Sequence, residues 1–542
     1  MESLLAGVPR LAVGEYFLLG TSSVILAVCV TLYQAVYTLG EYSDSGLPLA
    51  GEPPGKKTFS LRTRLRYYYD AAALYTEAYQ KYAKQGKAIL VPGYGSRADL
   101  VLPESSVEWA ITQPDATLSL SQAFLQANHS TYSLGHSRYW GDGWQFSLVK
   151  TQLNDILSTL IPAVQDELHH AMPKYFGTET QSWKEIDVGT SVQMLVGQTS
   201  SRFNVGLPLC RNEEYLDRTQ KIIKGVMITA IAGNVFPGFL LPIVGRLTSL
   251  HTWYNISRVK KHLKPQYTER LAALGKEKED QPQDQLQIMM RFAQKKRPQE
   301  LNDVNIMATR LVAANFVAMH QTSDTLTTML LNIMDSDAKY NTIEVLREEA
   351  KRVLGNGEVG WNKENCAAMT SYDSVARETM RCSFPFGTRG LLRKVMKDDV
   401  VTNLGVPLKK GSIVSFLASA AQMDPGKYEN ALEFDPWRFS RVTEKDRKEK
   451  PGEEFPVTST GHHPQAFVTT SPEYLTFGHG KHACPGRFLV DFELKMIVAY
   501  ILQHYDLKFP DECKGRAPPM KHVAELNMPP PGARILVKKR VL

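Results

Sequence analysis

The longest uninterrupted apolar stretch of the chain lies near its N-terminus, where residues 16–38 carry no charged side chain. A helix of about 20 such residues spans the hydrocarbon core of a bilayer. Tyr16 and Tyr37, near the two ends of the stretch, suit the membrane–water interface. The stretch is too long for a secretory signal, and no small-x-small cleavage site follows it. The pattern therefore predicts a transmembrane anchor at 16–38, preceded by a short lumenal segment of residues 1–15.

Positive charge is distributed unequally about this stretch. Only Arg10 precedes it, whereas Lys56 and Lys57 lead a group of basic residues that follows it. The positive-inside rule then places the rest of the chain in the cytosol, and we expect a single-pass protein of the endoplasmic reticulum membrane. Residues 39–60 are rich in proline and glycine and are expected to form a linker, followed by one catalytic domain over 61–542.

Beyond the linker, long segments carry apolar residues at helical spacing. This period predicts a helix over 62–83 and helices through most of 145–350, including one over 305–333. A charged, proline-containing loop is expected to interrupt them at 275–287, and a second polar loop is expected at 441–471. Most of the body is therefore expected to be helical.

Strand-like alternation is confined to short runs near the two ends of the body. Residues 87–92 and 98–103 are predicted to form two strands joined by a turn at 93–96, and strand character returns near 394–404. The sequence shows no internal repeat. The expected fold is mainly α with a small β part that is drawn from both ends of the chain.

The composition is that of a folded globular protein. Hydrophobic residues make up 43% and charged residues 22% of the 542 residues, which argues against disorder. The net charge of +7 suits a mildly basic face toward anionic lipid or an acidic protein partner. The sequence has no convincing basic cluster interleaved with aromatic residues, so nucleic acid is not an expected partner.

The six cysteines are far apart and form no Cys-x-x-Cys pair, which indicates a reducing compartment and no disulfide framework. The glycosylation sequons at Asn128 and Asn255 are then expected to stay unused, because glycosylation requires the lumen. Cys484 differs from the other cysteines in its surroundings. It lies in the glycine-rich stretch 477–487, directly before a predicted apolar helix at 488–503.

This stretch has the properties of a loop that holds a reactive thiolate. Gly478, Gly480 and Gly486 allow tight turns and a close approach to a flat ligand. A cysteine directly before a helix lies where backbone N–H groups and the helix dipole stabilise a thiolate. A thiolate ligand pushes electron density onto haem iron and favours O–O cleavage. The stretch therefore predicts a haem ligand at Cys484.

Two other interpretations of the stretch stay open. His479, His482 and Cys484 are residue types that bind zinc, but a fourth ligand is missing nearby in the sequence and the glycines would have no role. Cys484 could also be a structural cysteine, which is the commoner case in proteins at large but does not account for this context.

The spacing Phe-x-x-Gly-x-x-x-Cys-x-Gly, formed by Phe477, Gly480, Cys484 and Gly486, resembles the haem-binding loop of the cytochrome P450 family, microsomal type. The resemblance covers everything after the anchor. It implies the cytochrome P450 fold, haem b as the cofactor and Cys484 as the axial ligand of the iron. The family usually has a basic residue two positions before the cysteine, in contact with a haem propionate. That position is His482 here, as in many filamentous-fungal members, which implies a weaker or pH-sensitive contact.

Two further motifs occur in the order that the family has. Glu378 and Arg381 match its Glu-x-x-Arg motif, and Arg438 matches the arginine of the segment that follows. In the family these three residues form a buried charge network that locks the cysteine loop. Glu-x-x-Arg alone also occurs by chance on exposed helices, so the weight lies on the ordered set.

The predicted helix at 305–333 resembles the oxygen-activating helix of the family. Thr322 would provide a hydroxyl that supports proton delivery, and Ala318, one turn earlier, would leave room over the haem. Gln321 stands where the family often has an acid, and because an amide cannot donate a proton as an acid does, the proton route is open. The alternative is a plain buried helix in which Thr322 bonds a backbone carbonyl.

Two cations match family positions near the haem propionates. Arg393 lies at the start of a predicted strand, and Lys150 lies on an early helix. For each of them, an exposed surface cation is an equally open interpretation.

The resemblance implies a membrane-anchored haem-thiolate monooxygenase that hydroxylates or epoxidises a hydrophobic small molecule with O2. Electrons would come from NADPH through a separate NADPH–cytochrome P450 reductase, because the sequence contains no flavin or nicotinamide motif. The likeness to filamentous-fungal members implies secondary metabolism on a terpenoid or polyketide skeleton. The expected partners are the reductase, the substrate and the lipid bilayer, without an obligate oligomer.

Two other functions stay open. A haem-thiolate isomerase or dehydratase on the same fold would need no external electrons, and a non-catalytic membrane haem binder would have no need of the Thr322 hydroxyl. Segments 128–144, 383–388 and 313–322 mix aromatic, apolar and small residues and are expected to line a hydrophobic pocket.

Overall fold

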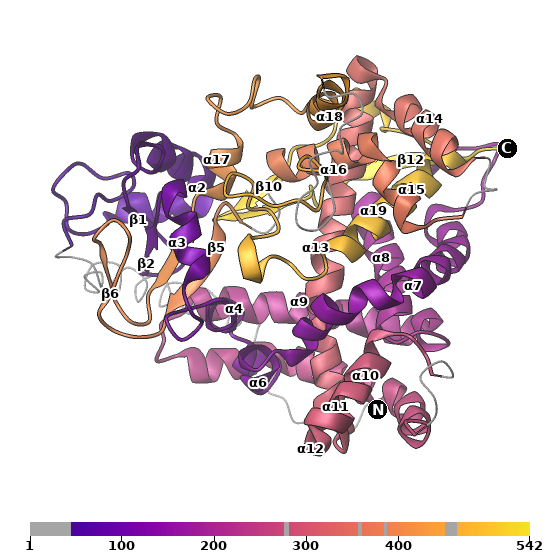
Figure 1. Ribbon diagram of the computed structural model, residues 1–542, viewed down its shortest axis with the longest axis horizontal. Coiled ribbons are helices and arrows are strands. Elements are labelled where there is room, and N and C mark those ends of the chain that lie inside the picture. Colours follow the sequence, from indigo (N-terminus) through magenta and orange to yellow (C-terminus); the bar gives the residue numbers. More distant parts are fainter. Residues whose placement is uncertain (1–44, 276–280, 356–359, 384–386, 450–462, 542) are drawn as a thin grey trace, which may run out of the picture.

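The computed structural model describes residues 45–275, 281–355, 360–383, 387–449 and 463–541 (Figure 1). The predicted anchor at 16–38 and the segment before it lie outside the described residues. Among the helices that the structure does describe, none combines the length and the apolar character needed to cross a membrane.

The fold is mainly helical with small sheets, as predicted. In Figure 1 the long helices fill one side of the molecule, and the N-terminal strands lie together with a few later segments on the other. The helices that frame the centre are α7 (Trp144–Phe176), α8 (Val188–Asn204), α9 (Glu213–Val235), α10 (Leu241–Ala272), α13 (Val304–Tyr340), α14 (Thr342–Leu354), α16 (Thr370–Cys382) and α19 (Arg487–His504).

The largest sheet joins segments from both ends of the body, and its strand order is β1-β2-β8-β5-β3. Its first two strands form the predicted hairpin, and β2 pairs in parallel with β8, Leu100 opposite Val414. The strands are β1 (Ile89–Pro92), β2 (Ala98–Val101), β3 (Leu118–Ser119), β5 (Gly390–Val395) and β8 (Ile413–Phe416).

Three smaller sheets complete the β part. One joins the C-terminal strands to a strand between two helices, in the order β4-β12-β9, and the other two are hairpins. Their strands are β4 (Lys184–Asp187), β6 (Val400–Val401), β7 (Pro407–Leu408), β9 (Tyr505–Lys508), β10 (Lys521–Val523), β11 (Leu526–Met528) and β12 (Arg534–Lys539). The prediction that strands come from both ends of the body is confirmed except for β4, which comes from the region 145–350 that was predicted to be helical.

Helix α13 occupies the centre of the helical part (Figure 1). It packs against α8, α9, α10, α14, α16 and α19, and most of its apolar side chains are buried. The helix is longer at its C-terminal end than the predicted 305–333. Its burial on most sides explains why its apolar positions are not confined to one stripe.

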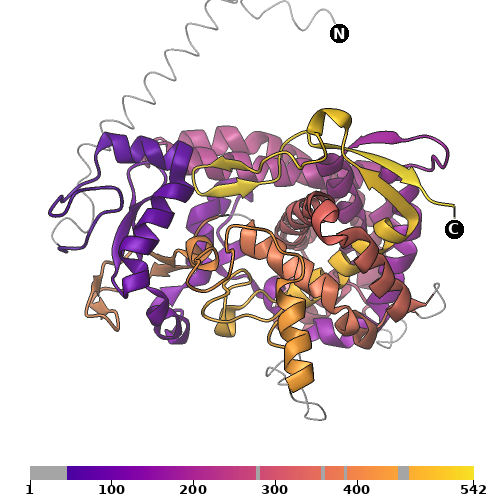
Figure 2. The same ribbon diagram turned by 90° about the horizontal axis from the view of Figure 1, so that it is seen from above.

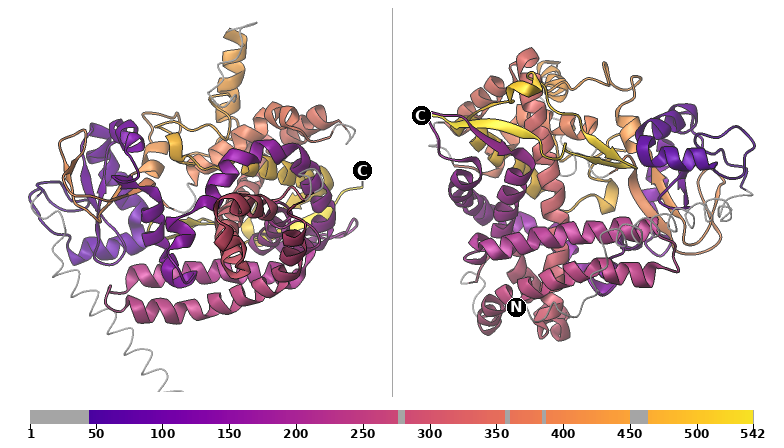
Figure 3. Two further views of the ribbon diagram at one scale, coloured as in Figure 1. Left: turned by 60° about the horizontal axis from the view of Figure 1, so that its bottom comes forward. Right: turned by 180° about the vertical axis from the view of Figure 1, so that it is seen from behind.

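Two predicted loops are partly helical, and the loop prediction was wrong for these residues. Residues at the start of the polar segment 441–471 belong to α18 (Arg438–Glu449), and the end of the segment 275–287 belongs to α11 (Gln285–Lys296). Helix α18 projects from the body in both Figure 2 and Figure 3. Its Phe439 is buried, and the backbone N–H groups of Phe439 and Ser440 donate to the Ser374 hydroxyl of α16.

The described part of the predicted linker packs on the body. Leu49 and Ala50 are buried, and the Ala50 N–H donates to the Leu90 carbonyl of β1 over 2.9 Å. The Glu52 carboxylate accepts the N–H of Ser60, which caps α2 (Leu61–Lys81). The two ends of the segment 49–60 are therefore held against β1 and the start of α2.

Candidate active site

The cysteine loop turns back on itself directly before α19. The Cys484 N–H donates to the Phe477 carbonyl over 2.7 Å. Gly478 and Gly480 have φ values of +68° and +66°, which L side chains rarely adopt, so these two turns depend on glycine. Gly486 has an ordinary φ of −86°, and a Cβ added there would meet no described atom within 4 Å.

The Cys484 thiol lies at the N-terminal end of α19. Burial raises its pKa, whereas the N–H groups of Gly486 and Arg487 and the Arg487 charge act in the opposite direction. The Arg487 guanidinium also donates to the Cys484 carbonyl over 2.9 Å. Metal binding deprotonates a thiol outright, so these donors would stabilise a thiolate ligand once the metal is bound.

Glu378 and Arg381 of α16 lie together with Arg438 at the start of α18. Glu378 and Arg381 are completely buried and form a two-bond pair of 2.7 and 2.8 Å on α16. The Nε of Arg438 lies 3.1 Å from both Glu378 oxygens. Arg381 also donates to the carbonyls of Gln422 and Ala431, which fixes the segment after α17 (Ala418–Gln422). Loss of one partner from such a network typically costs about 3–5 kcal/mol.

The predicted oxygen-activating residues lie on the middle turns of α13. Thr322 is buried and donates its hydroxyl proton to the Ala318 carbonyl over 2.7 Å, the contact that a plain buried helix would also make. Gln321 is exposed. His320 and Asp324, one turn apart, approach to 3.7 Å between Nδ1 and Oδ2.

Burial shifts both members of this His320–Asp324 pair toward their neutral forms. It lowers the pKa of His320 to about 4 and raises that of Asp324 to about 7. Residues two apart on a helix do not face each other, so Asp324 and Thr322 point to different sides of α13. Sequence reasoning missed Asp324, although a carboxylate two residues after Thr322 on the same predicted helix was a signal for it.

The two predicted propionate partners differ in their surroundings. Arg393 is 2% exposed, and within the described chain its Nη2 has no hydrogen-bond partner. Lys150 is exposed and donates to the Lys481 carbonyl in the cysteine loop over 3.1 Å. Arg393 therefore has one buried donor group, at Nη2, without an acceptor among the described residues, while its Nη1 donates to the Leu392 carbonyl over 2.9 Å. The Lys150 ammonium already has an acceptor.

His482 lies near Arg393 and Asp115. Burial lowers the pKa of His482, the charge of Arg393 lowers it further, and Asp115 acts against both. Burial also lowers the pKa of Arg393 to about 10. The His482 Nε2 lies 2.9 Å from the Asp115 carboxylate. Sequence reasoning missed Asp115, because it is far from both residues in the sequence.

These residues fit a haem. A thiol at a helix N-terminus suits the iron, and an orphaned buried guanidinium N–H suits a propionate. The added anion would also oppose the effect of burial on Arg393 and His482. The zinc interpretation has no support, since the described residues contain no group of three His, Cys, Asp or Glu side chains placed to bind a metal.

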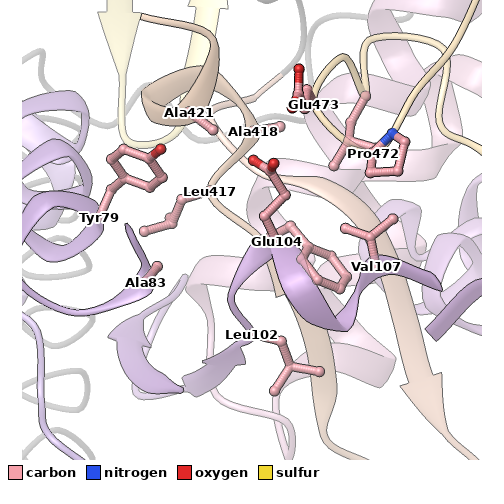
Figure 4. Close-up of a pocket in the computed structure, with 12 residues that line it drawn as sticks. Tyr79, Ala83, Leu102, Glu104, Val107, Leu417, Ala418, Ala421, Pro472 and Glu473 are labelled. Carbon is pink, nitrogen blue, oxygen red and sulfur yellow. The ribbon is translucent and has the colours of Figure 1, made fainter. Parts of the chain in front are cut away.

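A hollow elsewhere on the molecule is separate from these residues. It lies between the end of α2, the end of β2, α17 and the segment that leads to the cysteine loop (Figure 4). Its wall is apolar apart from two carboxylates and a phenol, and includes Tyr79, Glu104, Leu417, Ala418 and Glu473. None of the predicted site residues lines it, and the pocket segments expected at 128–144 and 313–322 do not contribute to it.

Comparison with protein families matches residues 140–537 to the cytochrome P450 family. The cytochrome P450 monooxygenase tenB of Beauveria bassiana (strain ARSEF 2860) is 48% identical over 530 residues, which are 96% of each chain. Two other relatives are the cytochrome P450 monooxygenases astC of Aspergillus terreus and pbrC of Penicillium brasilianum. They are 45% and 46% identical, over 95% and 94% of this chain and 96% and 94% of their own.

Proposed function

The chain belongs to the cytochrome P450 family, and from this premise we propose that it is a membrane-anchored haem-thiolate monooxygenase that hydroxylates or epoxidises a hydrophobic small molecule. The observation that carries the proposal is the Cys484 loop at the start of α19, backed by the buried Glu378–Arg381–Arg438 network. Bound haem would supply the insertion of one oxygen atom from O2, with electrons from NADPH through a separate reductase.

The residues of this chain would hold the haem in place and deliver protons. Cys484 would hold the iron, and Arg393, His482 and Lys150 would hold the propionate side. Thr322 would hold a proton at its Oγ1 on the distal side. Gln321, being exposed, would order water and cannot itself act as the acid.

Exposed apolar residues support a membrane location for the described body. Four of them, Ile243, Leu247, Leu250 and Tyr254, form a stripe on α10 and are each 55–62% exposed. Phe239, just before the helix, is 70% exposed. Such a stripe suits the boundary between lipid headgroups and acyl chains. Together with the apolar stretch at 16–38, it supports a single-pass protein of the endoplasmic reticulum membrane.

A second apolar stripe lies on the helix that follows the anchor in sequence. Leu61, Leu65 and Tyr69, at successive turns of α2, are 42%, 52% and 71% exposed. The neighbouring Tyr68 hydroxyl accepts the N–H of Gly95, and a Cβ added at Gly95 would lie 3.1 Å from the Asn234 carbonyl in α9. The start of α2 and the end of α9 are therefore close, so both stripes can meet one lipid surface.

The likeness to fungal monooxygenases along nearly the whole chain supports a role in fungal secondary metabolism. A terpenoid or polyketide skeleton is the substrate class that we propose. The experiment that finds it is metabolite profiling of a host that expresses the chain with a reductase, with and without candidate precursors. Product formation without NADPH would instead identify an isomerase or dehydratase.

The ligand assignment has its own test. We expect the reduced protein with carbon monoxide to show the strongly red-shifted Soret band of a thiolate ligand, and Cys484→Ala to abolish it while membrane retention is unchanged. Cys513→Ala is the matched control, because Cys513 is also partly exposed and unpaired but lies outside the loop. A normal band in Cys484→Ala would place the ligand elsewhere.

A further inference from the structure

A buried lysine on α19 is surrounded by acceptors from two other segments. Lys495 is 2% exposed, and its Nζ lies 3.0 Å from the Asp373 carboxylate of α16 and 3.0 Å from that of Asp491. It also donates to the Cys366 carbonyl over 3.0 Å. Lys495 is the cation that pairs with both buried carboxylates, so its removal would leave Asp373 and Asp491 without a cationic partner among the described residues.

Asp373 connects this lysine to the 466–469 segment, which precedes the cysteine loop. The Phe467 N–H donates to the Asp373 carboxylate over 3.0 Å. From the next turn of α16, Arg377 donates to the carbonyls of Ala466 and Thr469 over 2.8 and 2.9 Å. The segment is not part of a helix or sheet, so these side chains supply hydrogen-bond partners beyond its few backbone turns.

The 466–469 segment in turn contacts the cysteine loop in two ways. The Phe467 and Phe477 rings meet edge to face with centroids 5.1 Å apart, and the Phe477 carbonyl is the acceptor of the Cys484 N–H. Arg487 donates to the carbonyls of both Val468 and Cys484, over 3.0 and 2.9 Å. A displacement of the segment would therefore move both groups that fix the Cys484 backbone.

We propose that Asp373 and Lys495 are positioning residues for the Cys484 ligand, acting through the 466–469 segment. This inference rests on the proposed haem-thiolate function and adds a second buried charge network to that of Glu378. The Glu378 network holds the segment around 422–438, and the Lys495 network holds the 466–469 segment. Both networks include a residue of α16, and these residues, Asp373 and Glu378, are five positions or about 1.4 turns apart.

The test compares Lys495→Met with Arg270→Met in the full-length haem-loaded protein. Arg270 is the matched control because it forms an equally buried pair with Asp284, 2.6 Å apart, between α10 and the start of α11. Each variant is held at the same interval below its own unfolding midpoint, measured by circular dichroism. The readout is the rate at which the thiolate Soret band of the reduced carbon monoxide complex is lost.

We expect Lys495→Met to lose the thiolate band on the order of tenfold faster than wild type, because a local opening there costs less once the pair is broken. Arg270→Met should lower the unfolding midpoint and leave that rate unchanged. Equal rates in the two variants, or no change in Lys495→Met, would overturn the proposal. Should Lys495→Met give no folded protein, Asp373→Asn is measured instead, with the same expectation. Absence of the thiolate band from the wild type would overturn the proposed function itself. This outcome differs from failure of the Lys495 proposal, in which the wild type shows the band.

Discussion

The Thr322 hydroxyl has two possible tasks, to satisfy the Ala318 carbonyl or to pass a proton, and mutation separates them. If it passes protons, Thr322→Ala should consume NADPH at a comparable rate while product falls and hydrogen peroxide rises. Removal of a proton-transfer group typically costs about 10²–10⁴-fold, less where water replaces it. Product and peroxide measured per NADPH give the coupling.

Ser323→Ala is the matched control for this prediction. Ser323 is also buried on α13 and also donates to the carbonyl four residues earlier, that of Met319, over 2.7 Å. It should leave coupling unchanged. Because Gln321 is exposed, Gln321→Ala should have only a mild effect. Unchanged coupling in Thr322→Ala would show that the proton takes another route.

The two candidate propionate partners should differ in importance. Arg393→Leu removes the buried guanidinium with an unsatisfied N–H, so haem should dissociate at least tenfold faster, a loss of about 1.4 kcal/mol or more in charge-assisted bonding. Lys150→Met removes an exposed cation and should change the rate by less than about threefold. Transfer of haem to apomyoglobin measures both rates. Equal rates in the two variants would contradict the assignment.

Residues that belong to a family motif, including Arg438, could be predicted from the sequence. Charged residues outside these motifs that pair over long sequence distances could not. Glu378 and Arg381 are three apart, which places them on one face of a helix whatever the fold. Asp115, Asp373 and Lys495 reach their partners across more than a hundred residues, and such pairing leaves no local pattern.

At the scale of elements, long periodic helices were predictable and charged ones were not. The high charge of the segment that contains α18 predicts a loop, but the structure has a helix there. Its Glu, Lys and Arg residues are strong helix formers. Phe439 and Thr443, which are four residues apart, are both buried and form one buried face of the helix. The capping partner of its first turn, Ser374, comes from α16, so the sequence of α18 alone does not contain it.

The pKa shifts of His320 and Asp324 on α13 make the free energy of unfolding of the protein depend on pH. Burial raises the pKa of Asp324 from 3.8 to about 7, so between these values the unfolded state releases a proton that the folded state keeps. The contribution of Asp324 to the free energy of unfolding is therefore largest below pH 3.8 and falls as the pH rises to about 7. At ~1.4 kcal/mol per pKa unit, the total fall is at most about 4 kcal/mol.

Asp324→Asn should remove this loss, so its stability advantage over wild type should grow from about pH 4 to about pH 7. Urea unfolding at several pH values measures the advantage. His320 acts in the opposite direction, because its pKa is lowered to about 4 and protonation of the unfolded state costs stability below pH 6.5. A constant difference between Asp324→Asn and wild type over this range would show that Asp324 is not held neutral.

At the scale of the whole molecule, the anchor and the haem site are expected to be separable. Deletion of residues 1–39 should release much of the protein from membranes and retain haem, because Cys484 and the Glu378 network lie beyond residue 370 in the sequence. The exposed stripe on α10 should leave some lipid association, which Leu247→Glu in the truncated chain should reduce. Membrane flotation and haem content measure the two properties. Loss of haem on truncation would make the N-terminus part of the fold.

The parallel pairing of β2 with β8 also determines when the largest sheet can form during synthesis of the chain. Roughly three hundred residues separate the two strands, and a ribosome that adds about 5–20 residues per second needs about 15–60 s to pass from one to the other. Throughout that interval the hairpin β1–β2 has an open edge. Arg389, on the turn into β5, bonds both Asp99 of β2 and Glu525 of the β10–β11 hairpin, so this junction closes only after residue 525 has been made. Until then we expect the open strand edge of the newborn chain to be a site where other chains can pair and aggregate.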